Sequence, residues 1–316
     1  MSKSKELIIM HLRNNKGAYL SGAYLSSTLN ISRSAVWKNV NELRNYGYLI
    51  NAKAGYGYRL ESEPDRLESE LLLNNNMHYL KTVDSTNFEA RRIAEKDEGL
   101  ECIIVAEEQL KGRGRIGSSW YSPPHSGLWF SMLLRPEFIS PAKTTSITLV
   151  IAAVLAEFFN DKYTIPAKVK WPNDLLVGNK KIGGILTEIK GESDRIEYLI
   201  IGIGLNVNQQ LSDFPVELEP LASSLYLQSG RFINRTELLL DLTEELKTAC
   251  ALFFREGFAP FYQLWKKNNA TLGRHVTVKY GAKTLNGKAI DIKKDGALLL
   301  QDNLGINHII NYGDII

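Results

Sequence analysis

The ten residues KGRGRIGSSW, 111–120, decide between two classes of fold. They follow an apolar run, IIVAEEQ at 103–109, that is typical of a β-strand, and their glycines stand in the order G-x-G-x-x-G. In a dinucleotide-binding fold, a helix opens at the third glycine, and an acidic residue follows about 20 residues later. Here SSWYSPPHSG follows with two adjacent prolines, no acidic residue stands in that context, and no Gly-Lys-Ser/Thr completes a phosphate loop. The stretch therefore argues against a doubly wound fold and predicts a glycine-rich loop.

Two arginines, Arg113 and Arg115, give this loop a chemistry of its own. Glycine allows the backbone to approach a ligand closely, and exposed N–H groups of such a loop can form a nest for an anion. The arginines add fixed positive charge. The loop is thus suited to a site where several negative groups are brought together, although a disordered basic surface loop would have the same composition.

A second polar cluster lies in KWPNDLLVGNKKIGGILTE, 170–188. We expect a strand that reaches residues 171–174, a turn at Gly178-Asn179 and a returning strand. Lys181 can neutralise a carboxylate or phosphate as a point charge. Asp174 is a candidate ligand for Mg²⁺ and Lys170 a candidate phosphate contact, while Gly183-Gly184 would let a flat ligand lie on the backbone. The alternative is a hairpin whose polar side chains have no role in binding or catalysis.

The order of elements predicts a mixed sheet rather than a strictly alternating βαβ fold. We expect strands at 101–107, 127–134, 168–171, 182–189 and 196–204, and helices at 85–97, 140–160 and 234–256. The tail, 271–316, has short β-prone runs broken by glycine and asparagine, which predicts a small β-barrel.

The first sixty residues differ from the rest in charge. Residues 1–61 carry nine lysines and arginines against three acidic residues, whereas the remaining 255 residues carry 29 basic and 32 acidic ones. Helices are expected at 4–14, 21–30 and 32–47, the third capped by Ser32 and ended by Gly47. Such a small basic head is typical of a domain that meets nucleic acid.

The third of these helices has the features of a recognition helix. Val36, Val40 and Leu43 recur at helical spacing and can face inward. The outward face is then polar and basic, and comprises Arg33, Ser34, Trp37, Lys38, Asn41 and Arg44. A hairpin expected at 48–60 would form a wing in which Lys53 and Arg59 reach phosphates. The alternative is a small helical bundle used for protein contacts.

Bulk composition limits the remaining possibilities. No run of about 18 apolar residues and no cleavable leader stand in the sequence, so we expect no membrane partner. Cys102 and Cys250 are isolated, which fits a reducing cytoplasm and two ordinary packing residues. The five histidines, at 11, 78, 125, 275 and 308, show no metal-ligand spacing, so a zinc site is not expected.

Four segments together resemble the signature segments of the biotin–protein ligase family, in the same order and at similar spacing. They are DSTN (84–87), EEQLKGRGRIGSSWYSP (107–123), KWPNDLLVGNKKIGGILTE (170–188) and IGIGLNVN (201–208). With the basic head, nearly the whole chain resembles the bifunctional bacterial members, which combine a biotin ligase with a repressor of biotin genes. The resemblance implies an α+β chain of three domains: a winged helix-turn-helix at 1–62, a ligase domain like class II aminoacyl-tRNA synthetases at 67–268, and an SH3-like barrel at 269–316.

The resemblance also implies two half-reactions and the residues that serve them. Biotin and MgATP give biotinyl-5′-AMP and pyrophosphate, and a lysine of a carboxyl carrier protein then takes the biotin and releases AMP. The implied catalytic residues are Lys181, Arg113 and Arg115. Implied biotin contacts are Ser85, Thr86, Asn87, Gln109, Arg113, Gly114, Arg115, Trp120, Lys181 and Gly184. Implied ATP or adenylate contacts are Arg115, Lys170, Asn173, Asp174, Lys181 and Asn206, with Asp174 also holding Mg²⁺.

Segment 209–222 is implied to cover the adenylate, although it shows no obvious adenine-stacking aromatic, Leu221 being aliphatic. Trp120 and Trp171 have core packing as their alternative role. Operator DNA is implied to contact Arg33, Ser34, Trp37, Lys38, Asn41 and Lys53. Biotinyl-5′-AMP is implied to act as corepressor by favouring a homodimer.

Two other functions are compatible with parts of this pattern. A lipoate–protein ligase shares the reaction type but not the GRGRIG segment or the winged helix. A ligand-sensing transcription factor without ligase activity would have no need for Lys181 together with Arg113 and Arg115.

Overall fold

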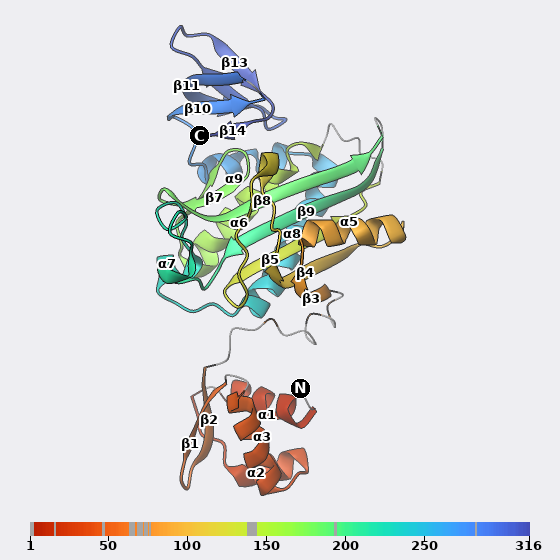
Figure 1. Ribbon diagram of the computed structural model, residues 1–316, viewed down its shortest axis with the longest axis vertical. Coiled ribbons are helices and arrows are strands. Elements are labelled where there is room, and N and C mark those ends of the chain that lie inside the picture. Colours follow the sequence, from red (N-terminus) through yellow and green to blue (C-terminus); the bar gives the residue numbers. More distant parts are fainter. Residues whose placement is uncertain are drawn as a thin grey trace. The chain divides into compact units, whose positions relative to one another are not determined.

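A computed structural model describes residues 3–15, 17–45, 48–62, 67, 72, 75, 77–137, 144–192, 195–281 and 283–316. The chain divides into two compact units, Met1–Asp65 and Arg66–Ile316. Figure 1 shows the elements of both units. The acidic linker predicted at 61–66 lies mostly outside the described residues, as does the Gly47 at which the third helix was expected to end.

The first unit has the predicted winged helix-turn-helix layout. A three-residue turn joins the second and third helices, and Ser32 caps the third by accepting a hydrogen bond from the Ala35 N–H at 3.1 Å. Val36, Val40 and Leu43 are buried, as their spacing predicts. The elements are α1 (Lys3–Asn14), α2 (Gly22–Leu29), α3 (Arg33–Asn45), β1 (Leu49–Lys53) and β2 (Gly57–Ser62).

The second unit is built on a seven-stranded mixed sheet in the order β3-β4-β5-β9-β8-β7-β6. Only the β3–β4 pair is parallel, and the other neighbours are antiparallel. The mixed sheet is therefore confirmed. Its strands are β3 (Met77–Val83), β4 (Cys102–Gln109), β5 (Gly127–Leu134), β6 (Ala167–Lys170), β7 (Asp174–Val177), β8 (Lys180–Gly191) and β9 (Ile196–Asn206).

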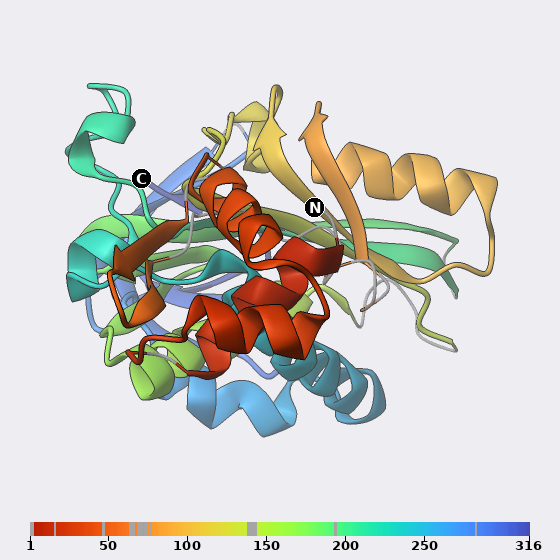
Figure 2. The same cartoon turned by 90° about the horizontal axis from the view of Figure 1, so that it is seen from below.

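Helices cover both faces of this sheet, and the alternation of strand side chains matches them. Ile103 and Val105 belong to the main core, together with helices α6 and α8, while Cys102 and Ile104 pack with Ala90 of α5 on the opposite face. Figure 2 shows α5 and α8 on opposite sides of the sheet. The helices are α5 (Thr86–Lys96), α6 (Ile147–Tyr163), α7 (Leu225–Ser229), α8 (Arg235–Glu256) and α9 (Tyr262–Lys267).

The tail forms a five-stranded antiparallel sheet in the order β13-β12-β11-β10-β14. Its short strands and frequent turns agree with the predicted small β domain. In Figure 1 it lies beside α9, at one end of the second unit. Its strands are β10 (His275–Tyr280), β11 (Lys283–Ile292), β12 (Leu298–Gln301), β13 (Asn307–Ile310) and β14 (Asp314–Ile315).

Three predictions of secondary structure need correction. The strand expected to run on to residues 171–174 instead stops at Lys170, and the chain reverses at Trp171-Pro172-Asn173 to begin β7. Strand β3 was not predicted. The helix expected at 140–160 is seen as α6 and begins at Ile147, while residues 138–143 lie outside the described part.

Candidate functional site

A cavity of about 660 Å³ lies on the α5 face of the sheet and extends to the C-terminal β domain. This size is within the range of small-molecule sites. Most of the site residues predicted from the four motifs meet here, although the motifs are far apart in the sequence. The predicted residues that line it are Ser85, Thr86, Asn87, Gln109, Arg113, Gly114, Arg115, Trp120, Lys170, Asn173, Asp174, Lys181 and Gly184.

The first end of the cavity is walled by the N-terminus of α5. Ser85 is the N-cap residue and lines the cavity, but its hydroxyl makes no capping hydrogen bond. Gln109 of β4 accepts hydrogen bonds from the Thr86 N–H at 2.9 Å and from the Thr86 hydroxyl at 3.1 Å. The Asn87 amide donates to Glu188 at 3.0 Å. These contacts fix the orientation of amide and hydroxyl groups that can recognise a polar ring.

Asp84, one residue before this wall, is also held in place. Arg92 donates two hydrogen bonds to its carboxylate, at 2.8 and 2.9 Å. These bonds, with help from the Ser85 N–H, lower the pKa of Asp84 to about 2. The carboxylate is therefore ionised near neutral pH and anchors the start of α5.

The glycine-rich loop is a closed hairpin rather than an open nest. The Gly114 N–H donates to the Ser118 carbonyl at 2.7 Å, and the Trp120 N–H donates to the Gly112 carbonyl at 2.9 Å. The prediction of exposed N–H groups is therefore wrong for these two amides, which are used within the loop. A disordered surface loop is likewise not what the structure shows.

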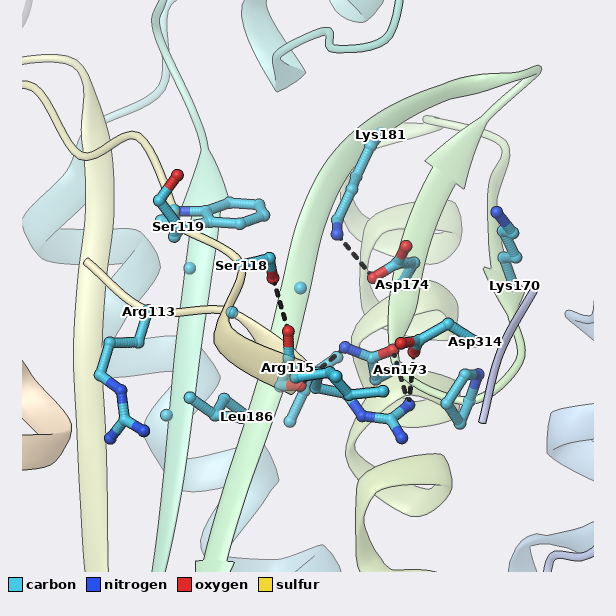
Figure 3. Close-up of a pocket in the computed structure, with 18 of the residues that line it drawn as sticks. Arg113, Arg115, Ser118, Ser119, Lys170, Asn173, Asp174, Lys181, Leu186 and Asp314 are labelled. Carbon is cyan, nitrogen blue, oxygen red and sulfur yellow. Dashed lines mark hydrogen bonds and ion pairs between the residues drawn. The ribbon is translucent and has the colours of Figure 1, made fainter. Parts of the chain in front are cut away.

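The two loop arginines point to different ends of the cavity, as Figure 3 shows. Arg113 pairs with Glu188 of β8 at 2.9 Å and lies over the Phe88 ring. Arg115 contacts Asn173 at 3.3 Å and pairs with Asp314 of β14 at 3.2 Å. The loop therefore supplies one positive charge to each half of the cavity.

The Trp120 ring packs against strand backbone at Gly184 and Gly204, where there are no side chains. A Cβ atom on Gly204 would come within 2.5 Å of the Trp120 Nε1 atom, and one on Gly202 within 2.0 Å of the Asn87 amide oxygen. Gly184 also faces Trp120, whereas Gly183 faces the core side chains Leu175 and Leu205. Of the predicted glycine pair, only Gly184 thus lines the cavity. Both Trp120 and Trp171 line the cavity, but Trp120 is only partly buried. Trp171 is buried, and its indole N–H donates to the Gly296 carbonyl.

Lys181 stands between the two ends. Its Nζ atom lies 2.7 Å from the Asp174 carboxylate and 5.1 Å from the centre of the Trp120 ring. The close approach is visible in Figure 3. The side chains of Lys181 and Asp174 are 33% and 21% exposed, so the pair is within reach of a ligand. An incoming anion can thus take Lys181 from Asp174.

Asn206 is buried but does not line the cavity. Its amide donates to the Ser223 carbonyl at 2.9 Å and to the Lys181 carbonyl at 3.4 Å. The segment 209–222 reaches the same strand, because the Lys181 N–H donates to the Leu221 carbonyl at 2.8 Å. Asn206 and this segment thus hold the backbone of Lys181.

The described residues include no cluster of three or more His, Cys, Asp or Glu side chains that is arranged to hold a metal. The cavity lining contributes two carboxylates, Asp174 and Asp314. Mg²⁺ is commonly held by one or two carboxylates together with substrate phosphates. These residues therefore suit a magnesium ion that arrives with a nucleotide.

The outward face of α3 in the first unit is exposed as predicted. Arg33, Ser34 and Lys38 are exposed, and Trp37 is 60% exposed. Asn41 is half-buried and accepts a hydrogen bond from Arg44, which also donates to the Ile50 carbonyl. Arg44 therefore ties the wing to α3. Lys53 lies in the wing, 4.2 Å from the centre of the Tyr56 ring.

Several residues of the site were not predicted from the sequence. Glu188, which contacts Asn87 and Arg113 of the cavity wall, stands in one of the four motifs but was given no role. No site residue was predicted in the tail, yet Lys279, Gly281, Tyr312, Asp314, Ile315 and Ile316 line the cavity. No local pattern in the tail could have revealed these, because only the fold brings the tail to the site.

Comparisons with known proteins agree with this arrangement. The Biotin/lipoate A/B protein ligase family matches residues 79–206, an HTH domain family matches 4–59, and the Biotin protein ligase C terminal domain family matches 271–316.

Relatives match over almost the whole chain. The bifunctional ligase/repressor BirA of Bacillus subtilis (strain 168) is 36% identical over 299 residues, 92% of each chain. That of Escherichia coli (strain K12) is 34% identical over 292 residues, 91% of this chain and 89% of the relative. The biotin protein ligase of Aquifex aeolicus, solved with biotin and ATP, is 32% identical with a TM-score of 0.66, and the match covers 76% of this chain and 97% of that one. Among the described residues, no helix has the length and apolar character needed to cross a membrane.

Proposed function

The chain belongs to the bifunctional ligase/repressor family of biotin protein ligases, and from this premise we propose how its own residues perform the two activities. As an enzyme it joins biotin to ATP to form biotinyl-5′-AMP and then transfers biotin to a lysine of a carboxyl carrier protein. As a repressor it binds operator DNA. One observation carries the proposal: a single cavity brings Lys181, the loop arginines and the amide wall at the start of α5 together.

In the first half-reaction, the amide wall holds the uncharged ring of biotin. Thr86, Asn87 and Gln109 are already hydrogen-bonded to their neighbours, so their orientation is set before the substrate arrives. Trp120 covers the ring against the glycine floor. The biotin carboxylate then extends towards Lys181, at the middle of the cavity.

The reaction requires two anions to approach one another. A carboxylate oxygen of biotin attacks the α-phosphorus of ATP, the bond between that phosphorus and the bridging oxygen of the β-phosphate breaks, and pyrophosphate leaves with the electron pair. Lys181 and Arg115 offset the repulsion between carboxylate and phosphate, so positioning and electrostatic stabilisation provide the catalysis. Asp174 holds Lys181 in the cavity until the substrates replace it.

A Mg²⁺ ion bound with ATP would neutralise part of the phosphate charge. Asp174 and Asp314 are the carboxylates placed to contact that ion from the cavity wall. In the second half-reaction, the ε-amine of the carrier lysine attacks the carbonyl carbon of the mixed anhydride. An amide forms, AMP leaves, and the amine loses its proton.

The test is biotin-dependent exchange of radioactive pyrophosphate into ATP, run in parallel with lipoate. Exchange with biotin is the expected result. Exchange with lipoate alone would instead assign a lipoate ligase, and tight biotin binding without any exchange would leave a ligand sensor. We place these reactions in the cytoplasm, where ATP is available and where two free, buried cysteines are usual.

The exposed face of α3 supports the second activity. In helix-turn-helix proteins the second helix of the motif enters the major groove, and a basic wing contacts the backbone. Arg33, Ser34, Trp37 and Lys38 are exposed together on α3. The repressor acts as a homodimer that biotinyl-5′-AMP favours, so that the adenylate serves as corepressor.

A further inference from the structure

The C-terminal sheet contributes to the cavity a lysine, Lys279, that lies outside the four sequence motifs. We propose that Lys279 of β10, together with Lys170 of β6, forms the subsite that holds the β- and γ-phosphates of ATP and then the leaving pyrophosphate. This inference rests on the proposed ligase function and extends it to a residue outside the ligase motifs.

The position of Lys279 follows from the strand register. In the antiparallel pair of β10 and β14, Lys279 stands directly opposite Asp314. Opposite residues of an antiparallel pair project from the same face of a sheet. Asp314 reaches the cavity, where its carboxylate meets Arg115. Lys279 lies on that same face, and it also lines the cavity.

A glycine keeps the two strands in this close arrangement. Gly313 has a φ of 147°, and a Cβ atom there would come within 2.7 Å of the Lys279 carbonyl oxygen. The rings of Tyr280 and Tyr312 meet edge to face beside it. The backbone that carries Lys279 and Asp314 is therefore packed in place.

Charge is unbalanced at this end of the cavity. Asp174 is paired with Lys181 and Asp314 with Arg115, so both acidic side chains of the lining already have a cation. Within the described part of the chain, neither Lys170 nor Lys279 has an ion-pair or hydrogen-bond partner for its ammonium group. Two cations without an anionic partner on this side of the cavity favour binding of an anion that carries at least two negative charges.

The chemistry of the step selects which anion this is. In phosphoryl transfer the attacking and leaving oxygens lie roughly in line across the phosphorus. The biotin carboxylate approaches from the amide wall, past Trp120. Pyrophosphate must therefore depart towards the opposite side. Figure 3 shows Lys170 and Asp314 on the side away from Arg113, and Lys279 stands opposite Asp314 in the strand pair. A cation there stabilises the charge that develops on the leaving oxygen.

The test compares Lys279→Ala with Lys288→Ala, a matched change on β11 of an exposed lysine that does not line the cavity. Biotin-dependent pyrophosphate exchange by the wild-type chain is measured first, because its absence would reject the ligase function rather than the subsite. We expect Lys279→Ala to raise the KM for MgATP and the inhibition constant for pyrophosphate by about tenfold each, the scale of one lost charge-assisted contact.

The KM for biotin should stay unchanged in this variant, and so should single-turnover transfer from preformed biotinyl-5′-AMP, which involves no pyrophosphate. Lys279→Arg should restore most of the ATP affinity, since it keeps the charge. The proposal is overturned if Lys279→Ala behaves as Lys288→Ala does. It is also overturned if the variant impairs biotin binding or adenylate transfer as strongly as it impairs ATP binding.

Discussion

The ammonium nitrogen of Lys181 lies 2.7 Å from a carboxylate oxygen of Asp174, inside the cavity that receives both substrates. The pair is partly exposed, so it is worth little as a stabilising salt bridge. Its value lies in holding the lysine where the biotin carboxylate and the α-phosphate meet. When the substrates bind, the biotin carboxylate and the α-phosphate replace Asp174 as the anionic partners of Lys181.

Lys181→Met should remove the main charge at the reacting atoms while keeping most of the side-chain volume. We expect biotin-dependent pyrophosphate exchange to fall by about 10²–10³-fold, as for loss of one preorganised electrostatic contact. The matched control is Lys190→Met, on the same strand but paired with Glu197 at the surface. Exchange that survives in Lys181→Met at the level of the control would show that another group performs this role.

Glu188 links the glycine-rich hairpin to α5. It accepts hydrogen bonds from Arg113 at 2.9 Å, from Arg91 at 3.1 Å and from Asn87 at 3.0 Å. Glu188→Ala should free Arg113 and leave the Asn87 NH2 group with only its longer bond, 3.3 Å, to the Leu186 carbonyl. We expect the KM for biotin to rise by about tenfold, the scale of one or two lost polar contacts.

The control for this change is Arg91→Ala, which removes one partner of Glu188 and leaves Arg113 and Asn87 in place. The KM for biotin of each variant is measured by steady-state kinetics, with biotin varied at saturating MgATP. Equal effects of the two substitutions would mean that Glu188 does not act through the hairpin and Asn87.

Local patterns in the sequence predicted the local elements well. The three helices of the first unit follow from apolar periodicity and a serine cap, and both are properties of neighbouring residues. Strand β3, by contrast, was missed because its sequence MHYLKTV shows no clear alternation of apolar and polar residues. The reversal at Trp171-Pro172-Asn173 was also missed, because the strand was expected to continue to the next turn, at Gly178-Asn179.

The motifs predicted the site residues that lie within them. They did not predict the contacts that form only when distant segments fold together. Arg113 and Arg115 were expected in one anion nest, yet one pairs with Glu188 and the other with Asp314, 75 and 199 positions further along. Pairings at such separations depend on the register of the sheet and on the docking of the C-terminal domain. Neither is readable from a segment of ten residues.

A buried ion pair supports the strand that leads into the hairpin. Arg235 at the start of α8 is 1% exposed, and its guanidinium lies 2.7 Å from the Glu107 carboxylate of β4 and 2.7 Å from the Gly127 carbonyl. Arg235→Met should leave a buried carboxylate without its cation. We expect the free energy of unfolding to fall by about 3–5 kcal/mol, as when one partner of a buried pair is removed.

Urea unfolding followed by tryptophan fluorescence measures that loss. The double variant Arg235→Met with Glu107→Gln should recover part of the stability, because it also removes the uncompensated charge. A double variant that is less stable than Arg235→Met alone would count against charge burial as the cause.

Asp84 predicts a pH dependence of stability. Its pKa is lowered from 3.8 to about 2, first by the hydrogen bond from Arg92. A carboxylate with a depressed pKa in the folded state stabilises the fold above its ordinary pKa, and this contribution is lost as pH falls through the folded value. Asp84→Asn should thus be less stable than wild type at pH 6, and the difference should shrink between pH 4 and pH 2.

Because Asp84 and Arg92 are each more than one-third exposed, solvent screening keeps this difference small. Thermal unfolding of both proteins at matched pH values tests the trend. A difference that stays constant down to pH 2 would show that Asp84 stabilises α5 through its hydrogen bonds and not through its charge.

Operator binding should depend on side chains that the ligase reaction does not use. Trp37 is the most exposed large hydrophobic side chain of α3, in the unit that carries the helix-turn-helix. We therefore expect Trp37→Ala and Arg33→Ala to weaken binding to the natural operator by about tenfold or more, as for lost base-edge contacts. Pyrophosphate exchange should be unchanged in both variants.

Lys53→Ala should act differently, because a phosphate contact carries no sequence information. It should weaken operator and random DNA equally, and it should reduce the slope of log affinity against log salt by about one. Lys3→Ala removes the same charge from α1, which is part of neither α3 nor the wing, and serves as control. Fluorescence anisotropy with biotinyl-5′-AMP present, over a range of salt, distinguishes these cases. If Trp37→Ala lost random and operator DNA alike, the base contacts would have to come from elsewhere in the first unit, and α3 would be a backbone-binding helix.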